Sequence, residues 1–376
     1  MESVEEPAGV SLSPLPVIVH DLGTDGSQKQ YNVSNQTLST LAVDELRHYR
    51  CFETPQGWVL ALDPASFQTF LWRPQDGERI QLPPKEQGFP QHCKCLLSDT
   101  PDAASGCSYV VVFDLDDSEM WFCKIGATPT DWVNYSYELS MILEGKIRRM
   151  TNIAKCHGIA AVGGKIYFVF TACELGVIEF SGKKGLKLYT IEVDMVDLPL
   201  TMPMASMYLV ESRGELFLVV IFFDGHNVHK LAKHAVYKMD FSKQAWCEVD
   251  EIGADRVFLL GGDNIRISCF GASCSADDLS GGPRGNCIYF LNHIAIEESF
   301  LHVIDLKKGT EQVQRPFRHN GYDMPSRSPF WLLPTECTFQ AQGSSFLPFN
   351  LRRHAKIGLF TFSCIFLLFV FLFGTM

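Results

Sequence analysis

The stretch GWVLALDPASFQTFLWRPQDGERIQLPP, from Gly57 to Pro84, decides the fold class. It holds one apolar run from Trp58 to Leu62, a second from Thr69 to Trp72, and a polar–apolar alternation from Arg79 to Leu82. Asp, Pro and Gly residues separate the three runs, and these residues favour turns. Short runs bounded by turns predict β-strands. With a further strand expected from His48 to Phe52, the region predicts four consecutive strands.

This pattern of four short strands returns four more times along the chain. Units of four strands that recur at intervals of roughly 50 to 65 residues are typical of a β-propeller. A single four-stranded sheet cannot bury both of its faces, whereas a ring of such sheets buries each face against a neighbour. The further units run from His92 to Tyr137, Asn152 to Val193, Ala205 to Ile252, and Val257 to Phe317.

The two ends of the repeating region supply strands that no full unit uses. Pro16 to Val33 holds two expected strands before the first unit, and Pro329 to Leu333 holds one after the last. Together they predict a composite blade that closes the circle. We therefore expect an all-β propeller of six four-stranded blades, with five or seven as alternatives. Helix is expected only in short turns, at Leu41 to Arg47 and at Tyr137 to Met150.

Composition narrows the classes of partner and compartment. The 376 residues carry a formal net charge of −11, so we expect no nucleic-acid partner, because phosphates require a basic face. The 13 cysteines include no C-x-x-C pair. The first residues, MESVEEPAGV, lack the apolar core of a secretory signal. These features favour a reducing compartment, cytoplasmic or nuclear, and neither a metal nor another cofactor is expected.

The run GWVLALD…FLWRPQDGERIQLPP resembles the opening of the plant KIB-type β-propeller family, formerly a plant domain of unknown function that often follows an F-box. The later stretches AVYKMDFSKQAWCEVDEIGADRVFLLGGDN and GNCIYFLN are similar to its second signature, and FWLLP to its C-terminal mark. Arg73 stands where the family pattern has Asn. The likeness spans about residues 15 to 336.

The resemblance implies a non-catalytic protein-interaction scaffold, here a monomer, whose partner is unknown. Leu15-Pro16 could open an F-box, but the following residues predict strand and turn, so we expect no F-box. Two alternatives stay open. One is a ubiquitin-ligase substrate-binding subunit that acts without its own F-box. The other is a hydrolase or lyase with its site in the central channel, which would require polar residues converging from several inner strands.

The segment GHNVHKLAKH is the first candidate for partner binding. Its spacing, H-x2-H-x4-H, matches no common metal motif, so we interpret it as a solvated loop between two strands of the fourth unit. Loops on one rim of a propeller often bind partners, and the lysines add charge. The candidate residues are His226, His229, Lys230, Lys233 and His234.

Three other segments suggest chemistry but predict structure instead. The DLDD run, Asp114 to Asp117, lies at an expected strand end, where Asp favours turns; Asp240 and Asp305 are interpreted in the same way. GGPRGN, Gly281 to Asn286, precedes a strand and not the helix that a phosphate-binding loop needs. GASCS, Gly271 to Ser275, lacks the final Gly of a nucleophile elbow. No catalytic residue is therefore predicted.

The C-terminal segment LRRHAKIGLFTFSCIFLLFVFLFGTM departs from the globular pattern. Residues 357–376 carry no charge and are long enough to cross a bilayer. The flanking Arg352, Arg353 and Lys356 would keep the propeller in the cytosol, as expected for a tail anchor in an internal membrane. The alternatives are a tail that folds back on the protein, or translation of a pyrimidine-rich stretch beyond the true last exon. The expected division is 1–14 flexible N-terminus, 15–336 propeller, 337–356 linker with a basic flank, and 357–376 transmembrane tail.

Overall fold

The opening stretch forms three strands of one small antiparallel sheet, as its pattern predicts. The computed structural model pairs β4 (Arg50–Glu53), β5 (Val59–Leu62), β6 (Thr69–Trp72) and β7 (Arg79–Leu82) in sequence order. A short helix, α1 (Asp44–His48), precedes this first blade. The structure describes residues 14–21, 28–41, 43–101, 107–126, 131–143, 146–150, 153, 158–181, 185–194, 196, 204–225, 227–261, 271–276, 282–295, 298–317 and 329–335.

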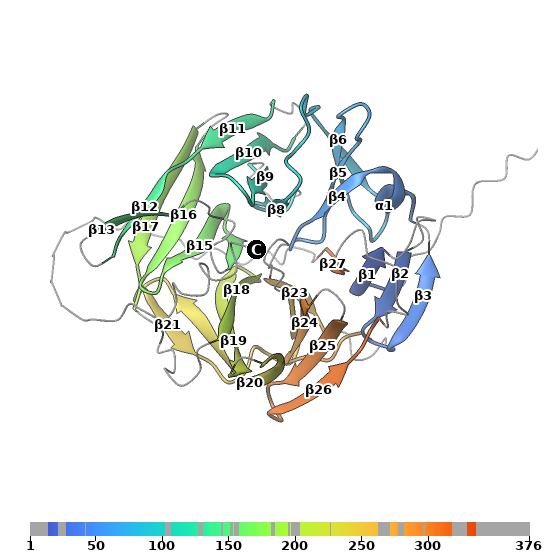
Figure 1. Ribbon diagram of the computed structural model, residues 1–376, viewed down its shortest axis with the longest axis vertical. Coiled ribbons are helices and arrows are strands. Elements are labelled where there is room, and N and C mark those ends of the chain that lie inside the picture. Colours follow the sequence, from blue (N-terminus) through green and yellow to red (C-terminus); the bar gives the residue numbers. More distant parts are fainter. Residues whose placement is uncertain are drawn as a thin grey trace, which may run out of the picture.

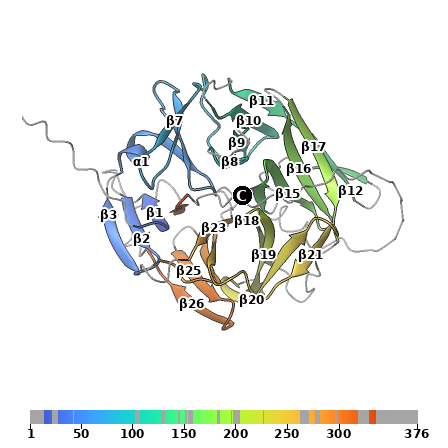
Figure 2. The same cartoon turned by 180° about the vertical axis from the view of Figure 1, so that it is seen from behind.

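Six such sheets stand around a common centre, which confirms the six-bladed propeller (Figures 1 and 2). The second blade comprises β8 (Cys93–Leu97), β9 (Tyr109–Asp114), β10 (Glu119–Lys124) and β11 (Val133–Ser136). The third comprises β14 (Ile159–Val162), β15 (Lys165–Thr171), β16 (Glu174–Ser181) and β17 (Gly185–Glu192). The fourth comprises β18 (Ala205–Ser212), β19 (Glu215–Asp224), β20 (Asn227–Asp240) and β21 (Ala245–Glu248).

The fifth blade departs from simple sequence order. Its strands run β23-β22-β24-β25-β26, and β22 pairs in parallel with β24. The GASCS segment is thus an additional strand on the inner side of the sheet. The strands are β22 (Arg256–Leu260), β23 (Gly271–Ser275), β24 (Cys287–Ala295), β25 (Glu298–Asp305) and β26 (Thr310–Gln314).

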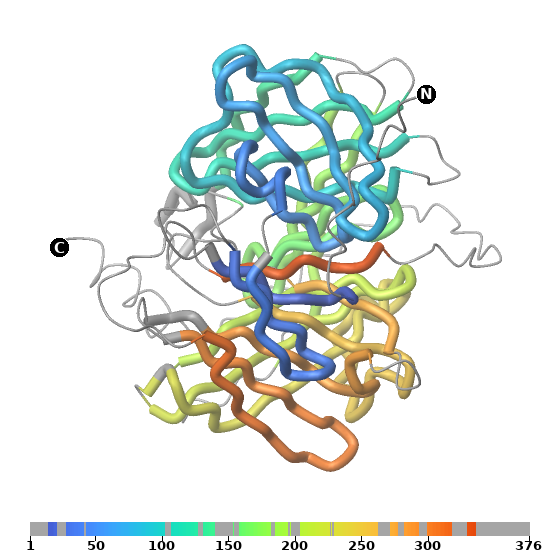
Figure 3. The backbone as a smooth tube through the Cα atoms, turned by 90° about the vertical axis from the view of Figure 1, so that its right-hand side faces the viewer, coloured from blue at the N-terminus to red at the C-terminus, as the bar shows by residue number. Residues whose placement is uncertain are grey.

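The sixth blade is the predicted composite of both chain ends. It joins β27 (Phe330–Leu332) to β1 (Val17–Asp21), β2 (Gln28–Asn32) and β3 (Thr37–Leu41). Val17 lies opposite Leu332 and Val19 opposite Phe330, and Figure 3 shows the two strands side by side. The Trp331 Nε1–H donates to the Leu260 carbonyl at 3.0 Å, which ties this closing blade to the fifth.

Apolar side chains fill the spaces between neighbouring sheets. Between the first and second blades, Trp58, Leu60 and Leu71 pack against Val110 and Val112. Central strands such as β5 and β6 are buried at every residue, whereas the outer strand β26 is largely exposed. The cores between the sheets hold the ring together through the hydrophobic effect, which grows with the apolar area buried.

Two helix predictions have different outcomes. The turn predicted at Leu41 to Arg47 corresponds to α1. The one predicted at Tyr137 to Met150 is wrong, because β12 (Leu139–Leu143) and β13 (Lys146–Met150) pair there as antiparallel strands. Only Glu-Gly separates the two strands in the sequence, and a two-residue spacer that ends in Gly is typical of a β-hairpin.

Within the described residues, no helix has the length and apolar character needed to cross a membrane. Arg352, Arg353, Lys356 and the apolar tail at 357–376 lie outside those residues. The same holds for the predicted linker at 337–356 and for residues 1–13 of the predicted N-terminal segment.

Candidate functional site

The predicted partner-binding loop is a strand, so the loop interpretation is wrong. Strand β20 begins at Asn227 and pairs with β19 as far as Asp224, through two irregularities in register. These irregularities interrupt the alternation of polar and apolar residues, which hid the strand from sequence analysis. Four of the five candidate residues therefore lie on β20, and His226 lies outside the described residues.

The pairing of the outer edge of β20 changes along the strand. Strand β21 pairs with β20 from Tyr237 to Asp240, and the Val249 N–H donates to the Val236 carbonyl just beyond this stretch. Among the described strands, none pairs with the outer edge of residues 227–234. An unpaired strand edge presents backbone N–H and C=O groups to solvent and can accept a strand from another chain.

The candidate side chains on β20 have different surroundings. His229, Lys230 and Lys233 are exposed, whereas His234 is half-buried. The Lys230 Nζ lies 2.6 Å from Asp224 Oδ2 in the same hairpin. The His229 ring contacts Phe300 of the fifth blade, with ring centroids 5.5 Å apart. The structure thus brings His229 and His234 toward the fifth blade and leaves the two lysines facing solvent.

Aromatic and charged residues of the fifth blade meet the β20 strand. The Arg315 guanidinium lies over the Phe300 ring, 4.9 Å from its centroid, so that His229 and Arg315 both contact Phe300. The buried His302 ring stacks on Phe290 at 5.7 Å, and its Nδ1 lies 2.6 Å from Glu311 Oε1. We call the exposed side chains of His229, Lys230, Lys233 and Arg315 the β20 face.

Two histidines in this region, His234 and His302, have pKa values below the usual value for histidine. Burial lowers the pKa of His302, and the hydrogen bond and charge of Glu311 only partly offset that effect. Burial also lowers the pKa of His234, against the opposing charge of Glu311. The described residues contain no group of three or more His, Cys, Asp or Glu side chains placed to hold a metal ion. The arrangement is suited to hydrogen bonding and ring contacts with another molecule.

The carboxylates at the strand ends are turn residues, as predicted. Asp114 Oδ1 accepts the Asp116 backbone N–H at 2.7 Å. Asp240 Oδ1 accepts the backbone N–H groups of Ser242 and Lys243, and Asp305 Oδ1 accepts that of Lys308 at 3.0 Å. Each carboxylate satisfies donors of its own hairpin, which is the ordinary role of Asp in such turns.

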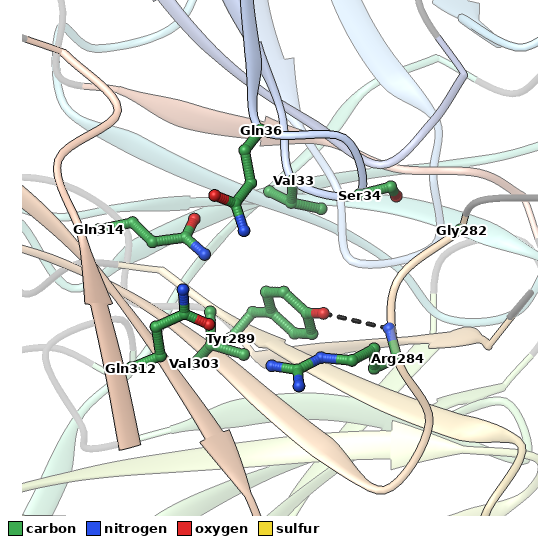
Figure 4. Close-up of a pocket in the computed structure, with 9 residues that line it drawn as sticks. All are labelled: Val33, Ser34, Gln36, Gly282, Arg284, Tyr289, Val303, Gln312 and Gln314. Carbon is green, nitrogen blue, oxygen red and sulfur yellow. Dashed lines mark hydrogen bonds between the residues drawn. The ribbon is translucent and has the colours of Figure 1, made fainter. Parts of the chain in front are cut away.

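Sequence analysis missed a pocket between the fifth and closing blades (Figure 4). The hollow, of about 250 Å³, is lined from one side by the β2–β3 turn and from the other by β24, β25 and β26. The discounted GGPRGN segment contributes Gly282 and Arg284 to its wall. No local motif could reveal this pocket, because its two sides are joined only when the ring closes. Its polar lining residues include Gln36, Arg284, Tyr289, Gln312 and Gln314.

Residues 30–320 match the family described as the KIB1-4 beta-propeller. No curated protein matches the chain. Similar solved structures include a luciferin-regenerating enzyme, at 11% identity and a TM-score of 0.28 over 81% of this chain and 96% of that chain. Regucalcin from Agrobacterium tumefaciens has 10% identity and a TM-score of 0.29 over 74% of each chain. The WD40 domain of SCAP from fission yeast has 10% identity and a TM-score of 0.31 over 82% of this chain and 89% of that chain.

Similarities at these TM-scores carry no argument about function. The match to the family covers more than half of the sequence and coincides with the blades described above. The chain therefore belongs to the KIB1-4 beta-propeller family.

Proposed function

We propose that this protein is a non-catalytic interaction scaffold that binds an acidic segment of a partner protein at the β20 face. The unpaired edge of β20, next to exposed Lys230 and Lys233, carries the proposal. Backbone groups on such an edge give affinity to an added strand, and the side chains give it specificity. A local group of cations complements an acidic segment of a partner, which makes this surface suitable for such a segment.

The neighbouring fifth blade supports the same role. Arg315 and His229 flank Phe300, so a guanidinium cation and two rings lie beside this edge of β20. The pairing of Lys230 with Asp224 is exposed and contributes little to stability. A carboxylate of the partner can therefore replace Asp224 at Lys230 with little loss of stability. Edge lysines also discourage unspecific strand pairing, which makes them selective for an acidic segment.

The test is quantitative crosslinking and affinity capture from plant cells that express the full chain. Lys233→Glu reverses one charge on the β20 face. Lys187→Glu is the matched control, because Lys187 is an exposed residue of β17 in the third blade. We expect one set of partners to be recovered with the wild type and the control, and at least fivefold less of it with Lys233→Glu. Equal recovery with all three proteins would contradict the proposal.

A chain that ends at residue 350 separates this surface from the predicted membrane tail. Partners bound at the β20 face should be recovered equally well without residues 351–376. Loss of all partners on this truncation would place binding on the tail or on the membrane it reaches, and would overturn the assignment to β20.

A further inference from the structure

The pocket between the fifth and closing blades has a buried, mainly apolar floor and a polar mouth. Val33, Tyr289 and Val303 form the floor, and each is at most 3% exposed. Arg284 and Gln312 are exposed at the mouth. Figure 4 shows glutamine amides and the Arg284 guanidinium converging around the Tyr289 ring. Pockets that bind small groups commonly combine an apolar floor with a few convergent polar side chains.

Hydrogen bonds between the blades fix the orientation of two lining groups. The Tyr31 hydroxyl donates to Gln314 Oε1 at 2.8 Å, so the Gln314 amide nitrogen keeps its two protons for another acceptor. The Arg284 backbone N–H donates to the Tyr289 hydroxyl at 3.1 Å, so that hydroxyl can donate its own proton. The first contact orients the Gln314 amide so that its nitrogen can donate to a ligand, and the second fixes the Tyr289 ring beside Arg284.

The pocket carries positive charge. Among the described residues that line it, Arg284 is the only charged one, and no described carboxylate forms an ion pair with it. The nearby Asp305 carboxylate is held by Lys308 Nζ at 3.0 Å, although the charge of Arg284 also contributes to the lowered pKa of Asp305. A donor-rich site with one guanidinium matches a single negative charge on two oxygen atoms, which is a carboxylate.

We propose that this interblade pocket binds a carboxylate carried by an extended segment of the partner protein, an inference that rests on the proposed scaffold role. Arg284 and the Gln314 amide donate to the carboxylate oxygens, and Tyr289 and the two valines contact the aliphatic part of the same residue. The carboxylate belongs either to the C-terminus of the segment or to an Asp or Glu side chain.

Three short peptides distinguish these sources when titrated into the purified full-length protein. The first is acetyl-Gly-Ser-Gly-Ser-Gly-Leu with a free C-terminal carboxylate, the second is its C-terminal amide, and the third is an amide in which Glu replaces Leu. Methyl resonances of Val33 and Val303 report binding at the pocket itself. We expect saturable shifts with the first or the third peptide, and none with the second. Shifts with all three peptides, or with none at millimolar concentration, would overturn the proposal.

Variants test the role of the guanidinium. Arg284→Gln should weaken binding of the carboxylate peptide about tenfold, as the loss of a charge-assisted hydrogen bond does. Lys307→Gln, which removes another exposed positive charge from the same blade outside the pocket, should leave binding within about twofold. Gln312→Ala provides a second pocket variant and should weaken binding about threefold. Melting temperatures confirm that each variant is folded.

The outcome is distinguishable from that of the capture experiment. Equal binding of the carboxylate peptide by Arg284→Gln and Lys307→Gln would contradict the proposal for the pocket and would not affect the proposal for the β20 face. If peptide binding depends on Arg284 but Lys233→Glu recovers as much partner as the wild type, the results would support the proposal for the pocket and contradict the one for the β20 face.

Discussion

Gly57 lies where the first blade meets the end of the closing blade. Its φ is +80°, and a Cβ atom built on it would lie 2.6 Å from the Pro334 carbonyl oxygen. Both the backbone conformation and the close approach of a second backbone therefore require glycine. Both residues of the Gly-Trp pair therefore have a structural role. Gly57 allows the close approach of the backbones, and Trp58 is buried in the core between the first two blades.

Gly57→Ala should destabilise the protein by about 2 to 4 kcal/mol, the sum of left-handed strain and overpacking. Gly77→Ala is the matched control: its φ is +77°, but a Cβ atom added there would meet no atom within 4 Å, so only the strain of about 1 kcal/mol applies. Urea denaturation at pH 7 measures both values. Equal costs would show that the contact with Pro334 contributes nothing.

The cysteines differ sharply in their exposure. Burial raises the pKa of Cys93 to about 12 and raises that of Cys95 well above its usual value. Because the thiolate is the reactive form, these thiols should not react with a disulfide reagent at pH 8, whereas exposed ones should react within minutes. Mass spectrometry after brief labelling identifies the modified sites. Rapid native labelling of Cys95 would contradict the packing. Within the described part of the chain, the exposed cysteines are Cys107, Cys173 and Cys247.

At the scale of the element, ion pairs join the fourth blade to the fifth. Glu215 of β19 accepts a hydrogen bond from Arg256 of β22 at 2.7 Å and pairs with Lys238 of β20. Burial alone would raise the pKa of Glu215, but the hydrogen bonds and charges of Lys238 and Arg256 lower it below its usual value of 4.5. The ionised carboxylate thus stabilises the folded state above about pH 4.5, and this contribution is lost as the pH falls through the lower folded-state pKa.

Glu215→Gln should lower the free energy of unfolding at pH 7 by about 1 kcal/mol, since the pair is only partly buried. The variant should also lose less stability than the wild type between pH 5 and 3, because the titrating group is absent. Urea denaturation over this pH series checks both effects. Glu179→Gln, which removes an exposed pair with Lys165 at 3.5 Å, should change stability by only a few tenths of a kcal/mol. Parallel pH profiles for wild type and Glu215→Gln would contradict this assignment.

Most strands could be predicted from the sequence. Their polar and apolar residues alternate, or they are continuously apolar, and they end at Asp, Gly or Pro. Two of the segments that were missed lack one of these signals. Strand β23 is built from small residues that are typical of turns, and it lies at the inner edge of the sheet, where it pairs antiparallel with β22. The start of β20 is rich in Lys and His, which have little β preference, and its register is irregular. The pocket could not be predicted for a different reason. Gln36 and Gln314 line it together only because closure of the ring brings distant parts of the chain side by side.

At the scale of the whole molecule, the ring depends on a strand contributed by the far end of the chain. β27 supplies Phe330, Trp331 and Leu332, all at most 4% exposed, to the cores on both sides of the closing blade. Without it, β1 would lose its inner partner and Leu260 would lose the hydrogen bond from Trp331.

A chain that ends at residue 328 should therefore be several kcal/mol less stable than one that ends at 335, since removing each large buried side chain costs about 3 kcal/mol or more. The longer truncation keeps every described strand and should melt close to the full-length protein. Thermal denaturation and limited proteolysis compare the two. A peptide of residues 329–335 added to the shorter chain should recover part of the loss. Identical melting of both truncations would show that β27 does not close the ring.

The same closure imposes a delay during synthesis. β1 ends at residue 21 and β27 begins at residue 330, so at 5 to 20 residues per second the ribosome needs about 15 to 60 s to deliver the second after the first. Throughout that interval the inner edge of β1 lacks its partner, because β27 has not yet been synthesised. A molecular chaperone that shields β1 for about a minute would therefore raise the yield of this protein, and a stalled ribosome would leave it prone to pair with the wrong chain.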